Sequence, residues 1–292
     1  MLRLGLVGFG KWGRNYVQAA LAAGNAQVTS VLLPEDSPTS ELARASGFFV
    51  TSDPYALDVD AVIVAAHPWR AAEFCEGFIG RGIPVMVEKP AALDLVSAQR
   101  ILDAASVGGA VVLVAHQHLF ATAYEYIRAK AQSVNLTEVT TRAGGNGPHR
   151  DYSALWDYGP HDVAMIFGLT GSDPICINSK QETGPEGSHV FLDLTFEKGT
   201  HASCEIWNDR LPKTRFLSVR TSNTEWIYDD LDSRGRLMCQ GRYLELPYEP
   251  ALTRAVRHFV DAVEAGGTDD YRFGADWALR VARWLTLAEP LS

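Results

Sequence analysis

The sequence predicts an α/β domain built on a doubly wound parallel sheet, followed by an α+β domain with a largely antiparallel open sheet. Short apolar runs alternate with helical patterns over roughly the first hundred residues, and a glycine-rich turn follows the first of these runs. After about Phe120 the pattern changes to strand-like segments separated by turn residues. Since 292 residues suffice for two cores, we expect domains at residues 1–118 and 119–292.

The first domain is predicted because apolar runs of strand length alternate regularly with helical patterns of hydrophobic residues. Residues 2–7 form a short apolar run that ends in glycines, and residues 12–23 follow with an alanine-rich helical pattern. Residues 60–66 are apolar on both faces, as in a parallel strand that is covered on both sides. Further strands are expected at 27–33, 83–87 and 110–115, and further helices at 40–45, 70–81 and 93–105. Strands and helices that alternate through short turns pair in parallel through right-handed crossovers.

The second domain is predicted to combine one sheet with a few helices. Strands are expected near 138–141, 190–196, 201–207, 215–221 and 225–228, and helices at 122–131 and 254–265. One face of this sheet must be covered by helices, and a partner subunit could cover the other. We therefore expect a homodimer or homotetramer formed through the C-terminal sheet.

Composition and charge narrow the possible partners. The formal net charge is -9 and no long basic cluster interrupts it, which argues against nucleic acid and anionic membrane as partners. The first apolar run is too short for a secretory signal, and no stretch of about 20 apolar residues follows, so we expect a cytoplasmic protein. The spacing of the four cysteines fits neither a zinc site nor a disulfide scaffold, so no metal is expected: Cys75, Cys176, Cys204 and Cys239.

The segment Gly8-Phe9-Gly10-Lys11-Trp12-Gly13 fits the dinucleotide-binding fingerprint. In that fingerprint the first glycine makes the turn, the second lets pyrophosphate approach the backbone, and the third lets helix and strand close together. The following helix then directs its N-terminus at the phosphates. A tight structural turn is the alternative, but the segment follows the first strand and opens a helix, which favours a cofactor site in a Rossmann domain.

The end of the second strand bears on which cofactor is bound. Leu33 and Pro34 occupy the place of the expected acidic residue, and Glu35 and Asp36 come directly after. A carboxylate here would bind the free ribose hydroxyls and repel an added phosphate, and no arginine follows immediately. We therefore expect NAD or NADP, with NAD favoured, and Glu35 or Asp36 as the ribose ligand.

Glu88-Lys89-Pro90 closes the apolar run at residues 83–87 and places a cation at the carboxyl end of a parallel strand, where open α/β folds bind their ligands. The proline keeps Lys89 out of the α region, so its side chain extends from a stiff loop. A surface lysine is the alternative. Near the glycine loop, however, an ammonium can orient a substrate hydroxyl and stabilise a developing alkoxide.

Asp157 and His161 lie four residues apart, at the start of a helix that we expect to begin near Pro160 and to stop at Gly171. At this spacing both side chains can face one space. A histidine is suited to take a hydroxyl proton near neutral pH, and a carboxylate can hold its tautomer. The alternatives are a helix N-cap followed by an exposed histidine, or a zinc site without an evident third ligand at short spacing.

Together, the glycine loop, Glu88-Lys89-Pro90 and the segment from Leu155 to Asp162 resemble the Gfo/Idh/MocA oxidoreductases. The resemblance implies an NAD(P)-dependent enzyme that moves hydride to or from a secondary alcohol of a sugar, an inositol or a related polyol. Lys89, Asp157 and His161 match the family's catalytic residues, and Lys89-Pro90 matches its cis peptide. The resemblance also places His67 and Pro68, with Glu88 and Lys89, on the cofactor side.

The chain departs from the family pattern at several positions. His67-Pro68 replaces a Thr-Pro pair, Ala72 stands where a histidine is frequent, and Leu119-Phe120 replaces an Arg-Phe pair. These departures leave open an inactive dinucleotide-binding regulator, or a reductase of a non-sugar substrate such as a tetrapyrrole or an imine. Further residues that could line the cleft are Trp69, Arg70, His118, Arg142, Asn146, Arg150, Trp207 and Lys213.

Overall fold

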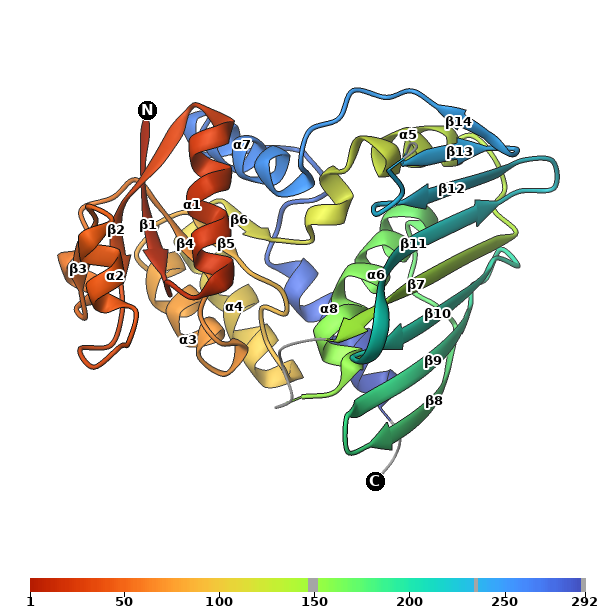
Figure 1. The fold of residues 1–292 in the computed structure, drawn as a ribbon, viewed down its shortest axis with the longest axis horizontal. Coiled ribbons are helices and arrows are strands. Elements are labelled where there is room, and N and C mark those ends of the chain that lie inside the picture. Colours follow the sequence, from red (N-terminus) through yellow and green to blue (C-terminus); the bar gives the residue numbers. More distant parts are fainter. Residues whose placement is uncertain (147–151, 234–235, 290–292) are drawn as a thin grey trace. The chain divides into compact units, whose positions relative to one another are not determined.

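The computed structural model describes residues 1–146, 152–233 and 236–289. The chain forms two compact units: residues 1–117 with 250–282, and residues 118–249 with 283–292 (Figure 1). The sequence prediction assigned all residues from 119 onward to the second domain, whereas the segment 250–282 belongs to the first unit.

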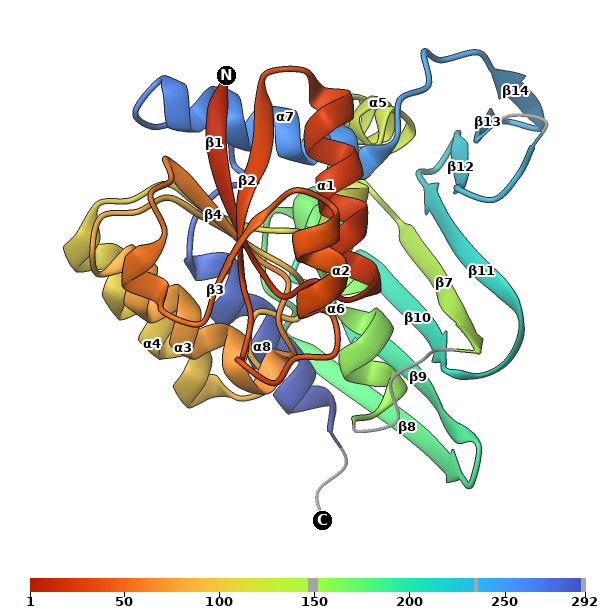
Figure 2. The same cartoon turned by 60° about the vertical axis from the view of Figure 1, so that its left-hand side comes forward.

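The first unit contains a parallel sheet of six strands in the order β3-β2-β1-β4-β5-β6. Its strands are β1 (Leu2–Val7), β2 (Ala26–Leu32), β3 (Phe49–Thr51), β4 (Ala61–Val64), β5 (Val85–Val87) and β6 (Val112–Val114). Its helices are α1 (Lys11–Ala23), α2 (Ser40–Ala45), the 3-10 helix η1 (Pro54–Ala56), α3 (Pro68–Ile79), α4 (Leu95–Gly108) and α7 (Ala251–Glu264). Figures 1 and 2 show α1 on one face of the sheet and α3 with α4 on the other.

This strand order places the point where the winding reverses between β1 and β4. Open α/β sheets bind ligands at the carboxyl ends of the strands beside such a point. The strand residues of β4, β5 and β6 are all buried, as expected for a sheet covered on both faces. The segments that follow β1, β2, β4 and β5 therefore emerge at one edge of the sheet, and they contain the expected cofactor residues.

Helix α7 packs against α1 and thereby joins the first unit although it follows the second sheet in sequence. Asn25 Nδ2 donates a hydrogen bond to Asp261 Oδ1 at 2.8 Å, and Gly274 N donates to Val112 O at 2.9 Å. Helix α8 (Asp276–Ala288) contributes to both units, since residues 276–282 belong to the first unit and residues 283–288 to the second.

The second unit contains eight strands in the order β14-β13-β12-β11-β7-β10-β9-β8. Its strands are β7 (Glu138–Asn146), β8 (Cys176–Gly184), β9 (Gly187–Thr195), β10 (His201–Trp207), β11 (Asp209–Arg220), β12 (Glu225–Asp229), β13 (Leu237–Cys239) and β14 (Arg242–Leu244). All neighbours pair antiparallel except β7 and β10, which are parallel. The predicted fold class, a doubly wound parallel sheet with a largely antiparallel second sheet, is confirmed.

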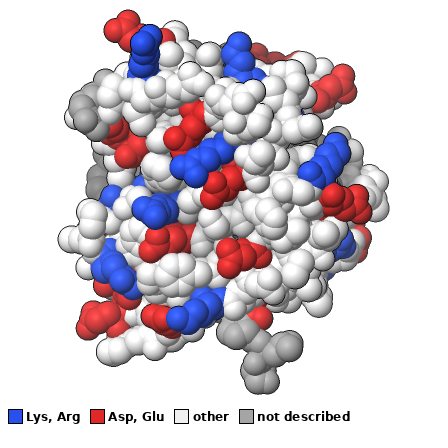
Figure 3. All heavy atoms as spheres, turned by 90° about the vertical axis from the view of Figure 1, so that its right-hand side faces the viewer, with Lys and Arg blue, Asp and Glu red and all other residues white. Residues whose placement is uncertain are grey.

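Helices α5 (Thr122–Ala131) and α6 (Ala154–Thr170) pack on one face of this sheet, and a short 3-10 helix η2 (Gln117–Phe120) precedes α5 (Figure 1). The opposite face carries interspersed acidic and basic side chains (Figure 3). Several are ion-paired: Arg142 with Glu205 at 3.3 Å, and Arg220 with Glu138 at 2.9 Å and with Glu225 at 2.8 Å.

One expectation about an element was wrong, and several strands were not predicted. Helix α6 begins at Ala154 instead of near Pro160, so the proline lies inside the helix and Asp157 and His161 sit on successive turns. The other difference is a set of strands that the sequence did not indicate, namely β3, β8, β13 and β14. Strand β8 is exposed along most of its length and shows no apolar alternation, and the others are only three residues long. In the described part of the chain, no helix combines the length and apolar character needed to cross a membrane.

Candidate active site

The glycine loop connects β1 to α1 in the first unit. Gly8 has a φ of +91°, and a Cβ on it would lie 2.7 Å from Ala65 O. A Cβ on Gly13 would lie 2.2 Å from Gly8 O. Phe9 is buried and its ring meets that of Phe48 edge-on at 5.5 Å, whereas Lys11 is exposed and Trp12 half-buried. The first and third glycines are therefore required by the packing of the loop itself.

Gly10 differs from the other two glycines of the loop. It is the N-cap of α1 with φ -71° and ψ -165°, a conformation that any residue adopts, and a Cβ on it would meet no described atom within 4 Å. Packing therefore gives no reason for a glycine here. The close approach of a pyrophosphate to the backbone at a helix N-terminus does give one, so the loop fits a dinucleotide.

Glu35 lies just beyond the carboxyl end of β2, the strand next to β1. Its side chain is exposed, and Ser52 Oγ donates a hydrogen bond to Glu35 Oε1 at 3.4 Å. This carboxylate and the glycine loop belong to the same edge of the sheet. The position fits a ligand of the cofactor's ribose hydroxyls.

His67 and Pro68 follow β4 at the same edge. His67 is the N-cap residue of α3, and Pro68 occupies the first position of the helix, where its missing N–H costs nothing. Both residues are half-buried, while Trp69 beside them is 64% exposed. Ala72, the position at which the family commonly has a histidine, is buried in α3.

Glu88 and Lys89 follow β5, and the Lys89-Pro90 peptide is cis, in agreement with the expectation from the family resemblance. The fully buried Tyr16 on α1 donates a hydrogen bond from its hydroxyl to Glu88 Oε2 at 2.5 Å. Burial, and then the charge of Glu88, raise the pKa of Tyr16 well above its usual range, so Tyr16 stays a donor at neutral pH. The glycine-loop helix is thereby tied to the segment that carries Lys89.

His116 lies just after β6 and is 2% exposed. Burial, followed by the positive charge of nearby Lys89, lowers the pKa of His116 to about 3. The imidazole is therefore neutral over the physiological range, and its ring packs 5.7 Å from that of Trp277. A neutral His116 adds no second positive charge next to the Lys89 ammonium.

Asp157 and His161 belong to the second unit, on successive turns of α6, and each is 5% exposed. The helix is buried along nearly its whole length, and Ser188 on β9 fixes its start by accepting a hydrogen bond from Ala154 N at 2.7 Å. The first turn also holds Asp157 where a negative charge is favoured by the helix dipole. The reading of His161 as an exposed histidine is wrong.

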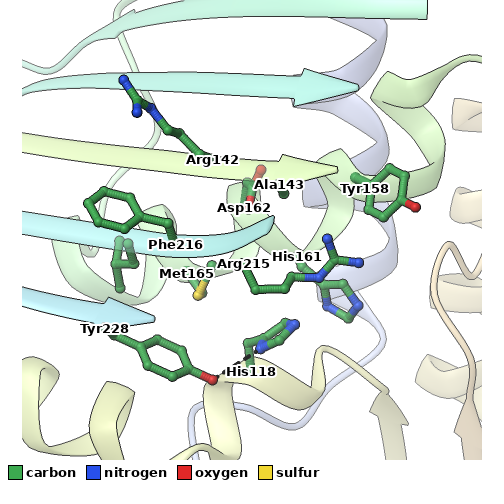
Figure 4. Close-up of a pocket in the computed structure, with 11 residues that line it drawn as sticks. His118, Arg142, Ala143, Tyr158, His161, Asp162, Met165, Arg215, Phe216 and Tyr228 are labelled. Carbon is green, nitrogen blue, oxygen red and sulfur yellow. Dashed lines mark hydrogen bonds between the residues drawn. The ribbon is translucent and has the colours of Figure 1, made fainter. Parts of the chain in front are cut away.

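His161 lines a small, partly enclosed pocket within the second unit (Figure 4). The ring of His118 meets the ring of His161 edge-on at 4.7 Å between centroids. His118 Nδ1 lies 3.4 Å from the hydroxyl of Tyr228, and burial followed by the charge of Asp230 raises the pKa of Tyr228. The described lining residues are His118, Arg142, Ala143, Tyr158, His161, Asp162, Met165, Arg215, Phe216, Leu217 and Tyr228. Asp157 is not among them.

Only some of the residues that the sequence analysis named for the cleft line this pocket. His118 lines it with a buried ring, whereas its neighbour Leu119 is buried in the core and cannot replace the arginine of the family pattern. Arg142 contributes to the lining, but its guanidinium turns away from the other labelled residues and pairs with Glu205 (Figure 4). Trp207 is buried against Gly144, and Arg150 lies outside the described residues.

Sequence reasoning missed Tyr158, Arg215 and Tyr228 as pocket residues. Arg215 had a usable signal, because it occupies the inward row of β11 with Leu217 and Val219, where an apolar residue is the rule. The described residues contain no group of three or more histidine, cysteine, aspartate or glutamate side chains that could hold a metal ion.

The chemistry available in each unit is distinct. The first unit provides a loop that fits a dinucleotide, with Lys89 at the same sheet edge. The second provides a partly enclosed pocket with two imidazoles, two phenols and the guanidinium of Arg215. All of these groups can hydrogen-bond to hydroxyls, and the imidazoles can also exchange protons near neutral pH.

Comparison with known proteins identifies a family for the first unit and relatives over most of the chain. Residues 2–116 match a family model described as the oxidoreductase family with an NAD-binding Rossmann fold, Gfo/Idh/MocA. Inositol 2-dehydrogenase 2 of Saccharopolyspora erythraea is 28% identical over 225 residues, which cover 70% of this chain and 66% of that relative. UDP-N-acetylglucosamine 3-dehydrogenase of Acidithiobacillus ferrooxidans is 24% identical over 90% of this chain and 89% of its own length.

Solved structures extend the similarity to the whole chain. A crystal structure from Magnetospirillum magnetotacticum MS-1, of a protein assigned as an oxidoreductase, has 31% identity and a TM-score of 0.88, and covers 99% of both chains. The crystal structure of the Acidithiobacillus ferrooxidans enzyme shares the fold with a TM-score of 0.87 at 19% identity, over 98% of this chain and 96% of that one. With a matching Rossmann domain and a relative of this identity over its full length, the chain belongs to the Gfo/Idh/MocA family of oxidoreductases.

Proposed function

We propose that this oxidoreductase transfers a hydride between a nicotinamide cofactor and a secondary alcohol or ketone of a sugar, an inositol or a related polyol. The observation that carries the proposal is the position of His161, a buried imidazole that opens into a pocket with other hydroxyl-binding groups. Relatives that are named inositol 2-dehydrogenase and UDP-N-acetylglucosamine 3-dehydrogenase support the same substrate class.

In this proposal Lys89, Asp157 and His161 are the catalytic residues. When bound, the nicotinamide cofactor supplies the hydride acceptor in the oxidative direction. A ring nitrogen of His161 takes the proton of the reacting hydroxyl, because hydride does not leave a neutral alcohol easily, and such a base contributes roughly 10² to 10⁴-fold. Asp157 orients His161 or binds a neighbouring hydroxyl. The Lys89 ammonium donates a hydrogen bond to the reacting oxygen and stabilises its developing negative charge.

The residues of the first unit that we propose for the cofactor hold its phosphates, its ribose and its ring. The loop residues from Gly8 to Gly13 provide the pyrophosphate site at the N-terminus of α1. Glu35 accepts hydrogen bonds from the ribose hydroxyls. His67, Pro68, Glu88 and Lys89 follow β4 and β5, and we assign them to the nicotinamide side.

Replacement of Lys89 by alanine tests the catalytic assignment. Turnover should fall by at least roughly 10²-fold, because a donor to a developing oxyanion is lost, while the dissociation constant for NAD stays within about threefold. The measurement is reduced-cofactor absorbance with a panel of sugars and inositols, together with a fluorescence titration of NAD. Near-native turnover of Lys89→Ala on a confirmed substrate contradicts the role of Lys89.

We further propose that NAD is preferred over NADP, since the Glu35 carboxylate follows β2 and repels a 2′-phosphate. Wild-type enzyme should therefore have a higher kcat/KM with NAD. The variant Glu35→Ser should narrow the ratio between the two cofactors by at least about tenfold, mainly through a lower KM for NADP. A variant with an unchanged ratio would remove Glu35 from the ribose site.

A second copy of this chain is proposed to cover the outer face of the eight-stranded sheet, as a homodimer or within a homotetramer. The support is an extended, exposed sheet face with both signs of charge interspersed, which suits self-complementary pairing (Figure 3). Light scattering of the purified protein should give two or four times the mass of one chain. A cytoplasmic location stays a prediction of the sequence.

A further inference from the structure

Arg215 is a charged residue on the side of the second sheet that faces the helices. Along β11, alternate side chains point to opposite faces, and Arg215 shares its row with the buried Leu217 and Val219. Its cross-strand partner on β7 is the buried Ala143. A half-buried guanidinium among these apolar neighbours loses part of its hydration, so its position requires compensating contacts.

Part of that compensation comes from the protein and fixes the orientation of the side chain. The guanidinium carbon Cζ lies 4.5 Å from the centroid of the Tyr158 ring, a cation–π contact. Nη1 donates hydrogen bonds to Thr214 O at 2.7 Å and to Gly144 O at 3.4 Å. The stacked ring and the two carbonyls hold the guanidinium plane in place, with the side chain extending toward Tyr158 and His161 (Figure 4).

The rest of the guanidinium has donors to spare. Over the described ranges, every hydrogen bond of this side chain leaves from Nη1, and no carboxylate oxygen lies within ion-pair distance of it. Asp230 lies near enough for the charge of Arg215 to act on it, but its ion pair is with Arg236, at 3.5 Å. Nε and Nη2 together form the edge of an arginine that binds carboxylates and phosphates with two parallel hydrogen bonds.

We propose that Arg215 binds an anionic group of the substrate, a carboxylate or a phosphate, so that the preferred substrates are sugar acids or sugar phosphates rather than neutral polyols. This inference rests on the proposed function, because it places the anion in the pocket that contains His161.

The same strand offers a matched control. Arg220 on β11 lies five residues after Arg215, an odd separation, and therefore points to the opposite face of the sheet. Its side chain is 52% exposed and its charge is already paired with Glu138 and Glu225. Arg220→Gln removes an arginine from the same strand without touching Arg215 or the residues that line the pocket.

The experiment compares substrates that differ only at C6: D-glucose, D-glucuronate and D-glucose 6-phosphate, and the same set in the galacto and manno series. For each sugar, kcat/KM is measured with wild type, Arg215→Gln and Arg220→Gln, and equilibrium binding to the NAD-loaded enzyme is measured in parallel. The wild type should prefer an acid over its neutral partner by roughly 10²-fold. A preference for the uronates would identify the group that Arg215 binds as a carboxylate. A preference for the sugar phosphates would identify it as a phosphate.

Arg215→Gln should remove this preference by lowering kcat/KM for the acidic sugars alone, while kcat/KM for the neutral sugars stays within about threefold. Arg220→Gln should behave as wild type. Equal use of acid and neutral partners by the wild type, with turnover retained, overturns the anion site but leaves the proposed function intact. If no sugar is turned over, the result counts against the proposed function, and the binding titrations alone then test the anion site. Equal binding of acidic and neutral sugars would in that case overturn the anion site.

Discussion

At the scale of single residues, glycine stands at each of three positions in the loop after β1 for a different physical reason. Gly8 needs a positive φ and a close approach to Ala65 O, and Gly13 needs a close approach to Gly8 O. Gly10 has an ordinary conformation and open space on its Cβ side. The fingerprint in the sequence identified all three, but only the tertiary structure separates the two that the fold requires from the one that a cofactor explains.

This difference predicts opposite outcomes for two alanine substitutions. Gly10→Ala should change the free energy of unfolding by no more than about 1 kcal/mol, because its φ and ψ suit alanine, yet weaken NAD binding at least about tenfold. Gly13→Ala should cost roughly 3 kcal/mol or more, because its Cβ collides with a backbone oxygen. Urea unfolding and a fluorescence titration with NAD measure both effects. Unaltered NAD affinity in Gly10→Ala would remove the loop from the pyrophosphate site.

At the scale of elements, helix α6 shows how a site helix is held by another part of the chain. Ser153 is the N-cap residue by position, but its side chain makes no capping hydrogen bond. Ser188 on β9 provides it, and Ser188 N in turn donates to Asn208 Oδ1 at 2.8 Å. The sheet therefore sets where α6 begins, and with it the positions of Asp157 and His161. This long-range cap explains why sequence reasoning placed the start of the helix too late, at Pro160.

The cap predicts unequal costs for two serine substitutions. Ser188→Ala should lower the free energy of unfolding by about 1 to 2 kcal/mol, because a buried N–H of α6 loses its acceptor. The matched change Ser153→Ala should alter it by less than about 0.5 kcal/mol. Urea unfolding followed by tryptophan fluorescence compares the two variants. Equal losses would show that the side chain of Ser188 does not cap α6.

At the scale of the whole molecule, His116 couples stability to pH. Its pKa is lowered to about 3 in the folded protein, first by burial and then by Lys89, from an ordinary value of 6.5. Between these values the unfolded chain binds a proton that the folded chain does not. The folded state is therefore favoured fully above pH 6.5 and loses stability as the pH falls from 6.5 toward 3, by about 1.4 kcal/mol per pH unit.

His116→Gln tests this dependence, because glutamine does not titrate. Between pH 7 and pH 5 the stability difference between wild type and variant should shift by roughly 2 kcal/mol in favour of the variant. The measurement is the urea unfolding midpoint at several pH values. The dependence of the unfolding free energy on urea concentration should be the same at each pH. Parallel pH profiles for the two proteins would rule out His116 as the titrating group.

The sequence by itself determined the alternation of strands and helices, the glycine loop, and the motifs around Lys89 and His161. These follow from local periodicity and from short segments whose chemistry is written in consecutive residues. The tertiary structure alone decided that α7 packs on α1 in the first unit, and that His118, Tyr158, Arg215 and Tyr228 gather around His161. These pocket residues come from η2, α6, β11 and β12, and only strand register and helix packing bring such distant segments together.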